Sequence, residues 1–152
     1  MKQFFLLIIL CSIIFTFSAC DTDYKKQDDE LLQQYIQDNN LNAIAAQDGL
    51  YYTIDVVGTG DQATSLYSTV TVDYTGYMLD GSVFDSNVGG NSITFALSQV
   101  IKGWQYGIPY FKEGGKGKLL IPSHLAYGSS GSGSIPPNTP LIFDIDLISV
   151  QN

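Results

Sequence analysis

The stretch of sequence that decides the fold reads TVTVDYTGYMLDGSVFDS and covers residues 69–86. Apolar and polar residues alternate from Val70 to Tyr74, which is typical of a β-strand with one buried face. Asp80-Gly81 follows as a strong hairpin signal and leads into an apolar pair at residues 83–84. The stretch therefore predicts two antiparallel strands joined by a tight turn.

Further β-patterns lie on both sides of this hairpin. The period-two alternation begins near Leu50, further short strands are expected at 93–95 and 118–121, and the last strand covers 141–148. Residues 128–140 are rich in Gly, Ser and Pro and are expected to form a loop.

One helix candidate lies inside the β-rich region. It runs from Gln99 to Ile108 and is closed by Pro109. A single sheet must bury its apolar face against something, and this helix is the available cover. The sequence therefore predicts an α+β domain in which an antiparallel sheet packs on one short helix.

Composition limits the possible classes of protein. The chain has 152 residues, of which 45% are hydrophobic and 14% are charged, so it suits one ordinary domain rather than a coiled coil or a disordered acidic chain. Only one long apolar run occurs, which excludes a polytopic membrane protein. The 15 acidic residues outnumber 7 basic residues, all lysine, and the net charge of −8 argues against nucleic acid as a partner.

The N-terminus is predicted to be a secretory signal of the lipoprotein type, residues 1–19. Lys2 supplies a positive charge, and the apolar run from Phe4 to Phe17 is too short to span a bilayer. It ends in Phe17-Ser18-Ala19-Cys20, which resembles the bacterial lipobox. We expect Cys20 to be lipidated, which would anchor the chain outside the cytoplasm, on the periplasmic face or the cell surface. The alternative is a plain signal peptide cleaved near Ala19.

The segment before the β-rich region is expected to have two parts. Residues 20–30 form a polar tether, and residues 31–47 a short helical segment with apolar residues at helical spacing. The acidic run at 28–30 fits either a surface-export signal or the first turn of that helix, and we favour the helix because its macrodipole attracts negative charge. The helix is expected to dock on its own domain, with a dimer contact as the alternative.

Metal, nucleotide and nucleophile chemistry find little support. His124 is the only histidine, the only cysteines are Cys11 and Cys20, and no phosphate-binding glycine motif occurs, so no cofactor or metal is expected. His124 lies in a turn-like sequence and is expected at the surface. The chain is rich instead in aromatic residues, with 10 Tyr, 8 Phe and 1 Trp, which favours an apolar binding pocket.

Five short motifs, in order and spacing, resemble the FKBP-type peptidyl-prolyl cis–trans isomerases. They are VDYTG (72–76), DGSVFDS (80–86), VIKGW (100–104), LAYG (125–128), and IPPN with LIFD (135–138 and 141–144). The resemblance covers residues 48–152. It implies a half-barrel sheet of five to six antiparallel strands wrapped around a short helix.

The resemblance also implies a site and an activity. The activity is acceleration of Xaa–Pro bond rotation without covalent chemistry, in exported or unfolded proline-containing polypeptides, with macrolides such as tacrolimus or rapamycin as further ligands. Trp104 would form the floor, Tyr127 and the Ile101 N–H would bind substrate carbonyls, and Asp85 would lie at the rim near the twisting amide. The walls would be Tyr74, Phe84, Val100, Ile101 and Phe143, and Ile135 would close the site from its loop.

Two departures from the family pattern bear on macrolide affinity more than on activity. Ile93 stands where better-known members carry a second aromatic wall, so it is expected to be a weaker wall. No arginine is present to pair with Asp85. Two other functions remain open at this point: a non-catalytic proline-binding module or holdase chaperone with the same pocket, and a structural envelope lipoprotein, which would need no open aromatic pocket.

Overall fold

The computed structural model describes residues 19–152, and the expected leader lies outside this range apart from Ala19. The helices and strands are α1 (Ala19–Asp38), β1 (Ile44–Ala45), β2 (Tyr51–Tyr52), β3 (Thr69–Met78), β4 (Val83–Ser86), β5 (Ile93–Ala96), α2 (Lys102–Gly107), β6 (Lys116–Ile121) and β7 (Leu141–Gln151). Short 3₁₀ helices are η1 (Gln47–Gly49), η2 (Leu97–Gln99), η3 (Ile108–Tyr110), η4 (Ser123–Leu125) and η5 (Gly128–Ser130).

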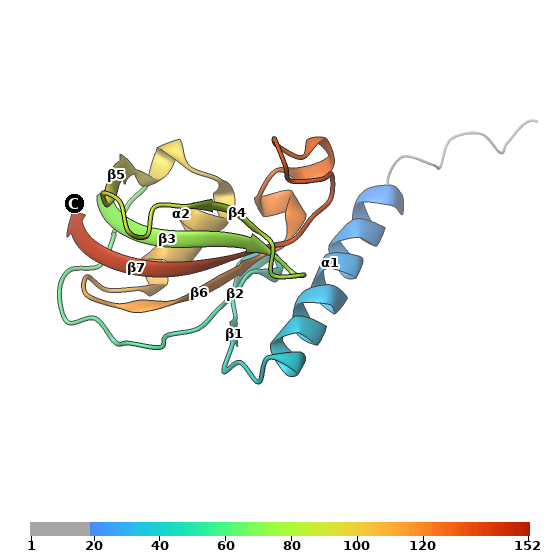
Figure 1. The fold of residues 1–152 in the computed structure, drawn as a ribbon, viewed down its shortest axis with the longest axis horizontal. Coiled ribbons are helices and arrows are strands. Elements are labelled where there is room, and N and C mark those ends of the chain that lie inside the picture. The colour runs from blue at the N-terminus through green and yellow to red at the C-terminus, as the bar shows by residue number, and fades with distance from the viewer. Residues whose placement is uncertain (1–18) are drawn as a thin grey trace, which may run out of the picture.

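The strands form one antiparallel sheet in the order β1-β2-β6-β7-β3-β4, and β5 also pairs with β3. The long strands β3 and β7 lie side by side in the middle of the sheet, with Tyr74 opposite Ile145 and Gly76 opposite Phe143 (Figure 1). One end of β3 pairs with β5 and the other with β4, so the stretch 69–86 forms the predicted hairpin. The sheet has seven strands in the described chain, more than the expected five to six, because β1 adds to the strand β2 that was expected near Leu50.

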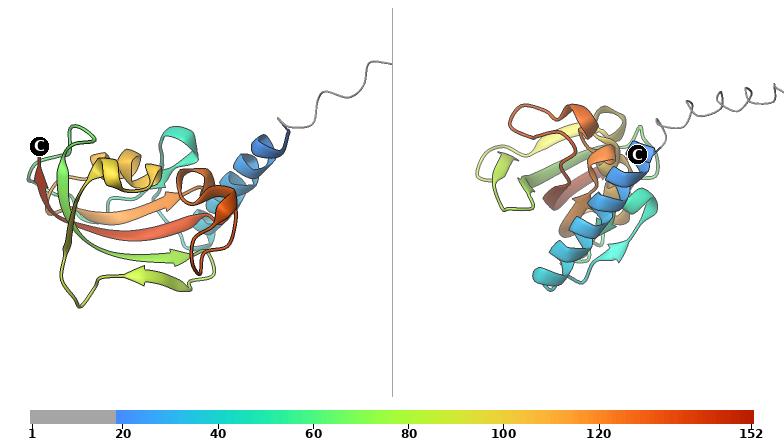
Figure 2. Two further views of the ribbon diagram at one scale, coloured as in Figure 1. Left: turned by 90° about the horizontal axis from the view of Figure 1, so that it is seen from above. Right: turned by 90° about the vertical axis from the view of Figure 1, so that its right-hand side faces the viewer.

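The main core lies on the inner face of the sheet, where α2 packs (Figure 2). Leu141, Phe143, Ile145 and Leu147 alternate along β7 and are all buried there, as the period-two pattern predicted. Their neighbours Asp144 and Asp146 face the other side and pair with lysines of β6. This alternation places every second residue of the central strands toward α2, which positions the site described below.

The predicted helix over Gln99–Ile108 is shorter in the structure. Val100 and Ile101 are extended, with ψ near 173° and 152°, and only residues 102–107 form α2. The carbonyl of Ile101 accepts the Trp104 N–H at 3.0 Å and thus closes the first turn. The chain then tightens into η3, where Pro109 has no N–H to continue an α-helix.

The outer face of the sheet carries a second, smaller core under α1. Leu32 is fully buried against Leu120 of β6 and Ile142 of β7. Residues 31–38 of the expected helical segment therefore dock on their own domain, as the sequence predicted. The remainder of that segment, up to residue 47, is wrong as an α-helix, because α1 ends at Asp38 and residues 44–45 form strand β1. Within residues 19–152, none of the helices is both long enough and apolar enough to cross a membrane.

The expectation of an extended polar tether at residues 20–30 is wrong, because the backbone of these residues belongs to the single helix α1. Residues 23–27 are exposed on it, whereas Asp28 is buried against η4. A docked helix can extend past its contacts with the sheet, because each added residue forms one more backbone hydrogen bond on a helix that is already nucleated. The acidic run at 28–30 thus lies in the middle of the helix and not in its first turn.

Candidate functional site

The candidate site is built around Trp104, the third residue of α2. The side chain is only 4% exposed and faces the central strands β3 and β7. Gly103 and Gly107 allow α2 to approach β6, because a Cβ on Gly107 would lie 2.8 Å from Leu119 Cδ1. That close approach brings the indole ring against the middle of the sheet.

Three aromatic rings pack directly on Trp104, and a fourth packs on one of these three. The ring centroids of Tyr74 and Phe143 both lie 5.2 Å from that of Trp104, at interplanar angles of 88° and 85°. Phe84 packs edge-on against Phe143 at 5.5 Å. Phe95 lies 5.5 Å from Trp104. We call these residues the aromatic cluster: Tyr74, Phe84, Phe95, Trp104 and Phe143.

A glycine makes this cluster possible. Gly76 is buried on β3, and a Cβ at this position would lie 2.8 Å from Phe84 Cε2 and 2.9 Å from Phe143 Cε1. Any side chain would therefore push the two rings apart. The small residue in the VDYTG motif thus has a packing role beside the tyrosine that precedes it.

Tyr74 and Asp85 form the polar edge of the cluster. The Tyr74 hydroxyl donates a hydrogen bond to Asp85, which is exposed on β4. Burial raises the pKa of Tyr74 above its usual value, and the Asp85 hydrogen bond and charge, together with Tyr127, raise it further. Tyr74 is therefore a neutral phenol at physiological pH, and it orients the carboxylate of Asp85.

Tyr127 stands at the rim between η4 and η5, with 37% of its side chain exposed. The charge of Tyr127 is the last of the causes that raise the pKa of Tyr74. Ile135, in the loop that follows, is 7% exposed and belongs to the same core, while Val100 and Ile101 are half-buried at the start of α2. The structure thus brings Tyr74, Phe84, Trp104 and Phe143 into ring contact and bonds Asp85 to Tyr74. Of the apolar residues proposed as walls, one lies outside this core.

The exception is Ile93, the expected second wall. It lies on β5 opposite Val72, is 38% exposed, and is not part of the core around Trp104. Phe95, two residues further along the same strand, packs on Trp104 instead. The sequence analysis missed Phe95, although the alternation of β5 places it on the same face as Ile93.

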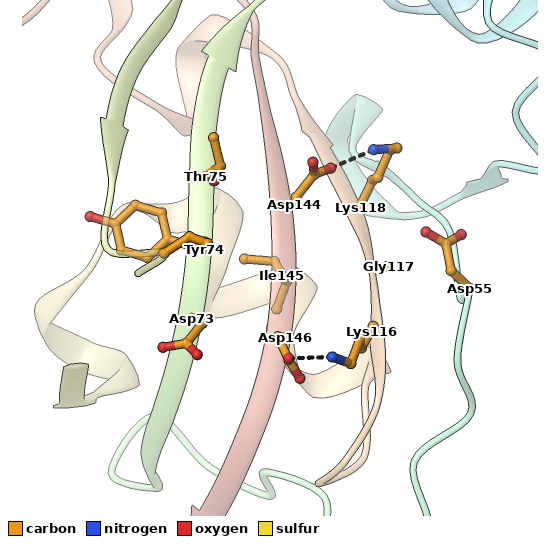
Figure 3. Close-up of a pocket in the computed structure, with 11 residues that line it drawn as sticks. Asp55, Asp73, Tyr74, Thr75, Lys116, Gly117, Lys118, Asp144, Ile145 and Asp146 are labelled. Atoms are coloured by element: carbon orange, nitrogen blue, oxygen red, sulfur yellow. Dashed lines mark hydrogen bonds and ion pairs between the residues drawn. The ribbon is translucent and has the colours of Figure 1, made fainter. Parts of the chain in front are cut away.

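A different hollow of about 380 Å³ lies between β3, β6 and β7 and is lined mainly by polar residues (Figure 3). Lys116 bonds Asp146 at 2.5 Å and Lys118 bonds Asp144, whereas Tyr74 points away from these pairs (Figure 3). The sequence analysis did not single out this hollow. The lysines of this hollow form ion pairs with aspartates. The lining is mainly polar, in contrast to the apolar surface of the aromatic cluster.

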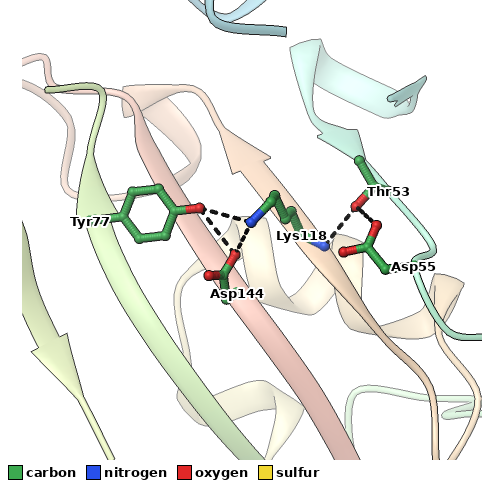
Figure 4. Close-up of polar contacts among 5 residues, drawn as sticks. All are labelled: Thr53, Asp55, Tyr77, Lys118 and Asp144. Atoms are coloured by element: carbon green, nitrogen blue, oxygen red, sulfur yellow. Dashed lines mark hydrogen bonds and ion pairs between the residues drawn. The ribbon is translucent and has the colours of Figure 1, made fainter. Parts of the chain in front are cut away.

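A hydrogen-bond network beside this hollow connects three strands. Tyr77 donates to Asp144 at 3.0 Å and Lys118 Nζ lies 3.1 Å from the Tyr77 hydroxyl (Figure 4). Thr53 accepts the Lys118 backbone N–H at 3.0 Å and donates to Asp55 at 2.9 Å (Figure 4). Burial, and then the Asp144 charge, raise the pKa of Tyr77. These contacts join β3, β6 and β7 to the segment that follows β2.

His124 does not lie at the surface as predicted. It is half-buried in η4, and both of its ring nitrogens are buried. Burial, and then the charge of Lys25, lower its pKa, with Asp28 and Asp48 acting in the opposite direction. The residue lies where α1, η1 and η4 meet. Among the described residues, no group of three or more His, Cys, Asp or Glu side chains could hold a metal ion.

Comparison with known proteins identifies the family. The sequence profile of the family described as FKBP-type peptidyl-prolyl cis-trans isomerase matches residues 60–148. The chain belongs to this family. The matched residues contain β3 to β6, α2 and most of β7, and therefore the whole aromatic cluster.

Several FKBP-type relatives match most of the chain. FkpA of Escherichia coli is 43% identical over 104 residues, which are 68% of this chain and 38% of that protein. A probable FKBP-type isomerase of Haemophilus influenzae is 41% identical over 84% of this chain and 52% of its own length. The chain therefore spans about half, or less, of the length of the curated relatives that it matches.

Solved structures of FKBP-type proteins have the same fold. The crystal structure of FkpA from Escherichia coli matches with a TM-score of 0.75 at 35% identity, over 86% of this chain and 60% of that one. A peptidyl-prolyl cis-trans isomerase from Pseudomonas syringae matches with a TM-score of 0.75 at 31% identity, over 91% of this chain and 100% of that one.

Proposed function

We propose that this protein is a peptidyl-prolyl cis–trans isomerase that accelerates Xaa–Pro bond rotation in exported proteins. The observation that carries the proposal is the aromatic cluster around Trp104, with Asp85 and Tyr127 at its edge, in a chain of the FKBP family. The proline ring of the substrate would lie against Trp104. This role needs apolar surface and hydrogen-bond donors, and no covalent step.

The physical basis is the difference in polarity between the planar and the twisted amide. Resonance sets a rotation barrier of ~18–20 kcal/mol, and the twisted amide has lost that resonance and part of its dipole. Apolar aromatic surroundings destabilise the planar amide more than the twisted one. Lowering the barrier by about 5–7 kcal/mol would accelerate exchange roughly 10⁴–10⁵-fold. Only interactions stronger in the twisted state contribute to this gain.

The polar groups would hold one side of the bond while the other rotates. The Tyr127 hydroxyl and the backbone N–H of Ile101 would each donate to a substrate carbonyl. Asp85 is oriented by Tyr74 and would lie near the rotating amide. Val100, Phe84 and Phe143 would line the walls, Ile135 would cover the proline from its loop, and Ile93 would make a peripheral contact.

The test is exchange NMR on a short Xaa–Pro peptide with the purified full chain in lipid nanodiscs. We expect faster cis–trans exchange with the wild-type chain and a loss of most of the acceleration in Trp104→Ala and Phe143→Ala. The matched control is Tyr110→Ala, which removes an aromatic ring stacked on Tyr52 at 4.4 Å, outside the aromatic cluster. A folded wild-type chain that binds the peptide without accelerating exchange would instead indicate a binding module or holdase.

We further propose that Cys20 carries a lipid anchor and that the domain works on the outer side of a bacterial membrane. The support is the leader-like sequence of residues 1–20, which ends in Ser18-Ala19-Cys20. Expression of the full chain in bacteria with a palmitate label tests this proposal. Cys20→Ser should lose the label and the membrane fraction, and Cys11→Ser, within the expected leader, should keep the label. A labelled Cys20→Ser chain would contradict it.

Macrolides such as tacrolimus or rapamycin are proposed as competing ligands of the same cluster. The support is the family membership and the aromatic surface. Because the chain has no arginine to pair with Asp85 and Ile93 does not belong to the core around Trp104, we expect weak inhibition by these ligands. Titration of rapamycin into the exchange assay of the wild-type chain measures this. Calorimetric binding of rapamycin to Trp104→Ala with an unchanged affinity would place the ligand elsewhere.

A further inference from the structure

α1 carries a buried carboxylate, Asp28, although apolar contacts already dock this helix on the sheet. Asp28 is 2% exposed, while Leu32, one turn later, already fills the outer core. Burying a carboxylate costs free energy unless hydrogen bonds compensate it. The two donors that compensate Asp28 come from one residue, Ser123 of η4, which is 95 positions away in the sequence.

Ser123 contacts Asp28 through two hydrogen-bond donors. Both the backbone N–H and the hydroxyl of Ser123 donate to the same carboxylate oxygen, Oδ2 of Asp28, at 2.8 and 2.6 Å. Charge-assisted hydrogen bonds of this kind are short and directional. They fix the first residue of η4 in orientation as well as in position.

η4 leads directly to Tyr127. The Ser123 carbonyl accepts the Ala126 N–H at 2.9 Å, and the Pro122 carbonyl accepts the Leu125 N–H at 3.0 Å. Tyr127 is the next residue, and on its other side the Gly128 carbonyl accepts the Asn138 N–H at 2.8 Å. The backbone of Tyr127 is thus held from two sides, and one of them begins at Asp28.

We propose that Asp28 is a positioning residue for the isomerase site, acting through Ser123 and η4 on the Tyr127 hydroxyl. This inference rests on the proposed function, in which Tyr127 donates to a substrate carbonyl. It assigns to α1, which lies outside the residues matched by the family profile, a part in the chemistry. In Figure 1 the helix lies beside the loop segment that contains η4.

The neighbouring residue supplies a matched control. Asp29 lies one position further along α1 and accepts a hydrogen bond from Tyr51 of β2 at 2.6 Å, so it also connects the helix to the sheet. Its hydrogen bonds go to Gln33 and Tyr51 and not to η4. A variant at Asp29 therefore loses a docking contact without disturbing the path to Tyr127.

The experiment measures kcat/KM by exchange NMR and protease-coupled assay for the full chain in nanodiscs. We expect Asp28→Ala to lower kcat/KM about fivefold, mainly through kcat, and Asp28→Asn to stay within about twofold, because its amide oxygen can accept both Ser123 donors. Asp29→Ala should be near wild type. In a Tyr127→Phe background, Asp28→Ala should cause no further loss, because the group it positions is already absent.

Two outcomes would overturn the inference. One is an equal fractional loss from Asp28→Ala with and without the Tyr127 hydroxyl, and the other is an equal loss from Asp29→Ala. If Asp28→Ala does not fold, Ser123→Ala removes one donor and takes its place in the same cycle.

A second readout separates this inference from the proposed function. Fluorotyrosine NMR gives a signal for Tyr127 that is assigned by its absence in Tyr127→Phe. That signal should shift or broaden in Asp28→Ala and not in Asp29→Ala. A wild-type chain without isomerase activity would defeat the proposed function, and an unchanged Tyr127 signal in Asp28→Ala would defeat this inference independently.

Discussion

Tyr127 is the residue whose hydroxyl we expect to matter most for the rate. It is 37% exposed and lies between η4 and η5. A neutral hydrogen bond is worth about 1 kcal/mol net, so Tyr127→Phe should lower kcat/KM on the order of tenfold. Exchange NMR measures the change. Tyr67→Phe, at a side chain that is 86% exposed, serves as the control. A loss above a thousandfold would show that the hydroxyl has a further role.

His124 should make stability depend on pH. Its pKa in the folded chain is below the ordinary histidine value of 6.5, because burial and Lys25 outweigh Asp28 and Asp48. The folded state therefore binds fewer protons than the unfolded state. The stability that neutral His124 contributes is complete above about pH 6.5 and is lost as the pH falls below it.

Urea denaturation at pH 7, 6 and 5 tests this expectation. The free energy of unfolding should fall from pH 7 to pH 5 in the wild-type chain, and the fall should be smaller in His124→Gln, which cannot be protonated. Equal slopes in the two proteins would show that His124 is not the group that titrates.

At the scale of elements, the contact between α2 and β6 depends on glycine. Alanine is normally favoured over glycine in a helix by about 1 kcal/mol. At Gly107 a Cβ would lie 2.8 Å from Leu119 Cδ1, so steric overlap opposes that gain. We expect Gly107→Ala to destabilise the fold by roughly 1–3 kcal/mol.

A double variant identifies the cause. Leu119→Ala removes the atoms that the new Cβ would meet, so the combined loss in Gly107→Ala/Leu119→Ala should be smaller than the sum of the two single losses. Thermal and urea denaturation measure each of them. Strict additivity would mean that the clash with Leu119 does not determine the effect.

At the scale of the whole molecule, α1 and the sheet should unfold together. Leu32 is fully buried between the helix and the outer face, whereas Leu31 beside it is 41% exposed. Leu32→Ala should cost about 2–5 kcal/mol of unfolding free energy. Leu31→Ala should cost well under about 1 kcal/mol, as surface substitutions usually do. Similar losses in both variants would contradict the docking of α1.

The whole-molecule arrangement also limits what the membrane anchor would do. If Cys20 is lipidated, the anchor would join a helix that is docked on the domain from Asp28 onward, instead of a loose polar tether. The exposed turns at residues 23–27 would then be the only spacer within the described chain. With such an anchor, the orientation of the domain on the bilayer would be set by α1.

Local sequence patterns were enough for the long strands and the hairpin, but not for β1, which lies in the segment that was expected to be helical. Side chains alternate along a strand, so the pattern of residues 70–74 and 141–147 already states which residues face the core. The order of the five motifs was enough for the family and, through it, for most of the aromatic cluster. Both kinds of signal are carried by residues close together in the chain.

Tertiary structure alone decided the contacts between distant segments. Phe95, and not Ile93, packs on Trp104, because the position of α2 relative to β5 places the indole ring beside Phe95. Asp28 accepts hydrogen bonds from Ser123, and His124 is half-buried, because α1 packs against η4, which is far from it in the sequence. Such contacts depend on which faces meet in space, and no local pattern of hydrophobicity or turn residues encodes that meeting.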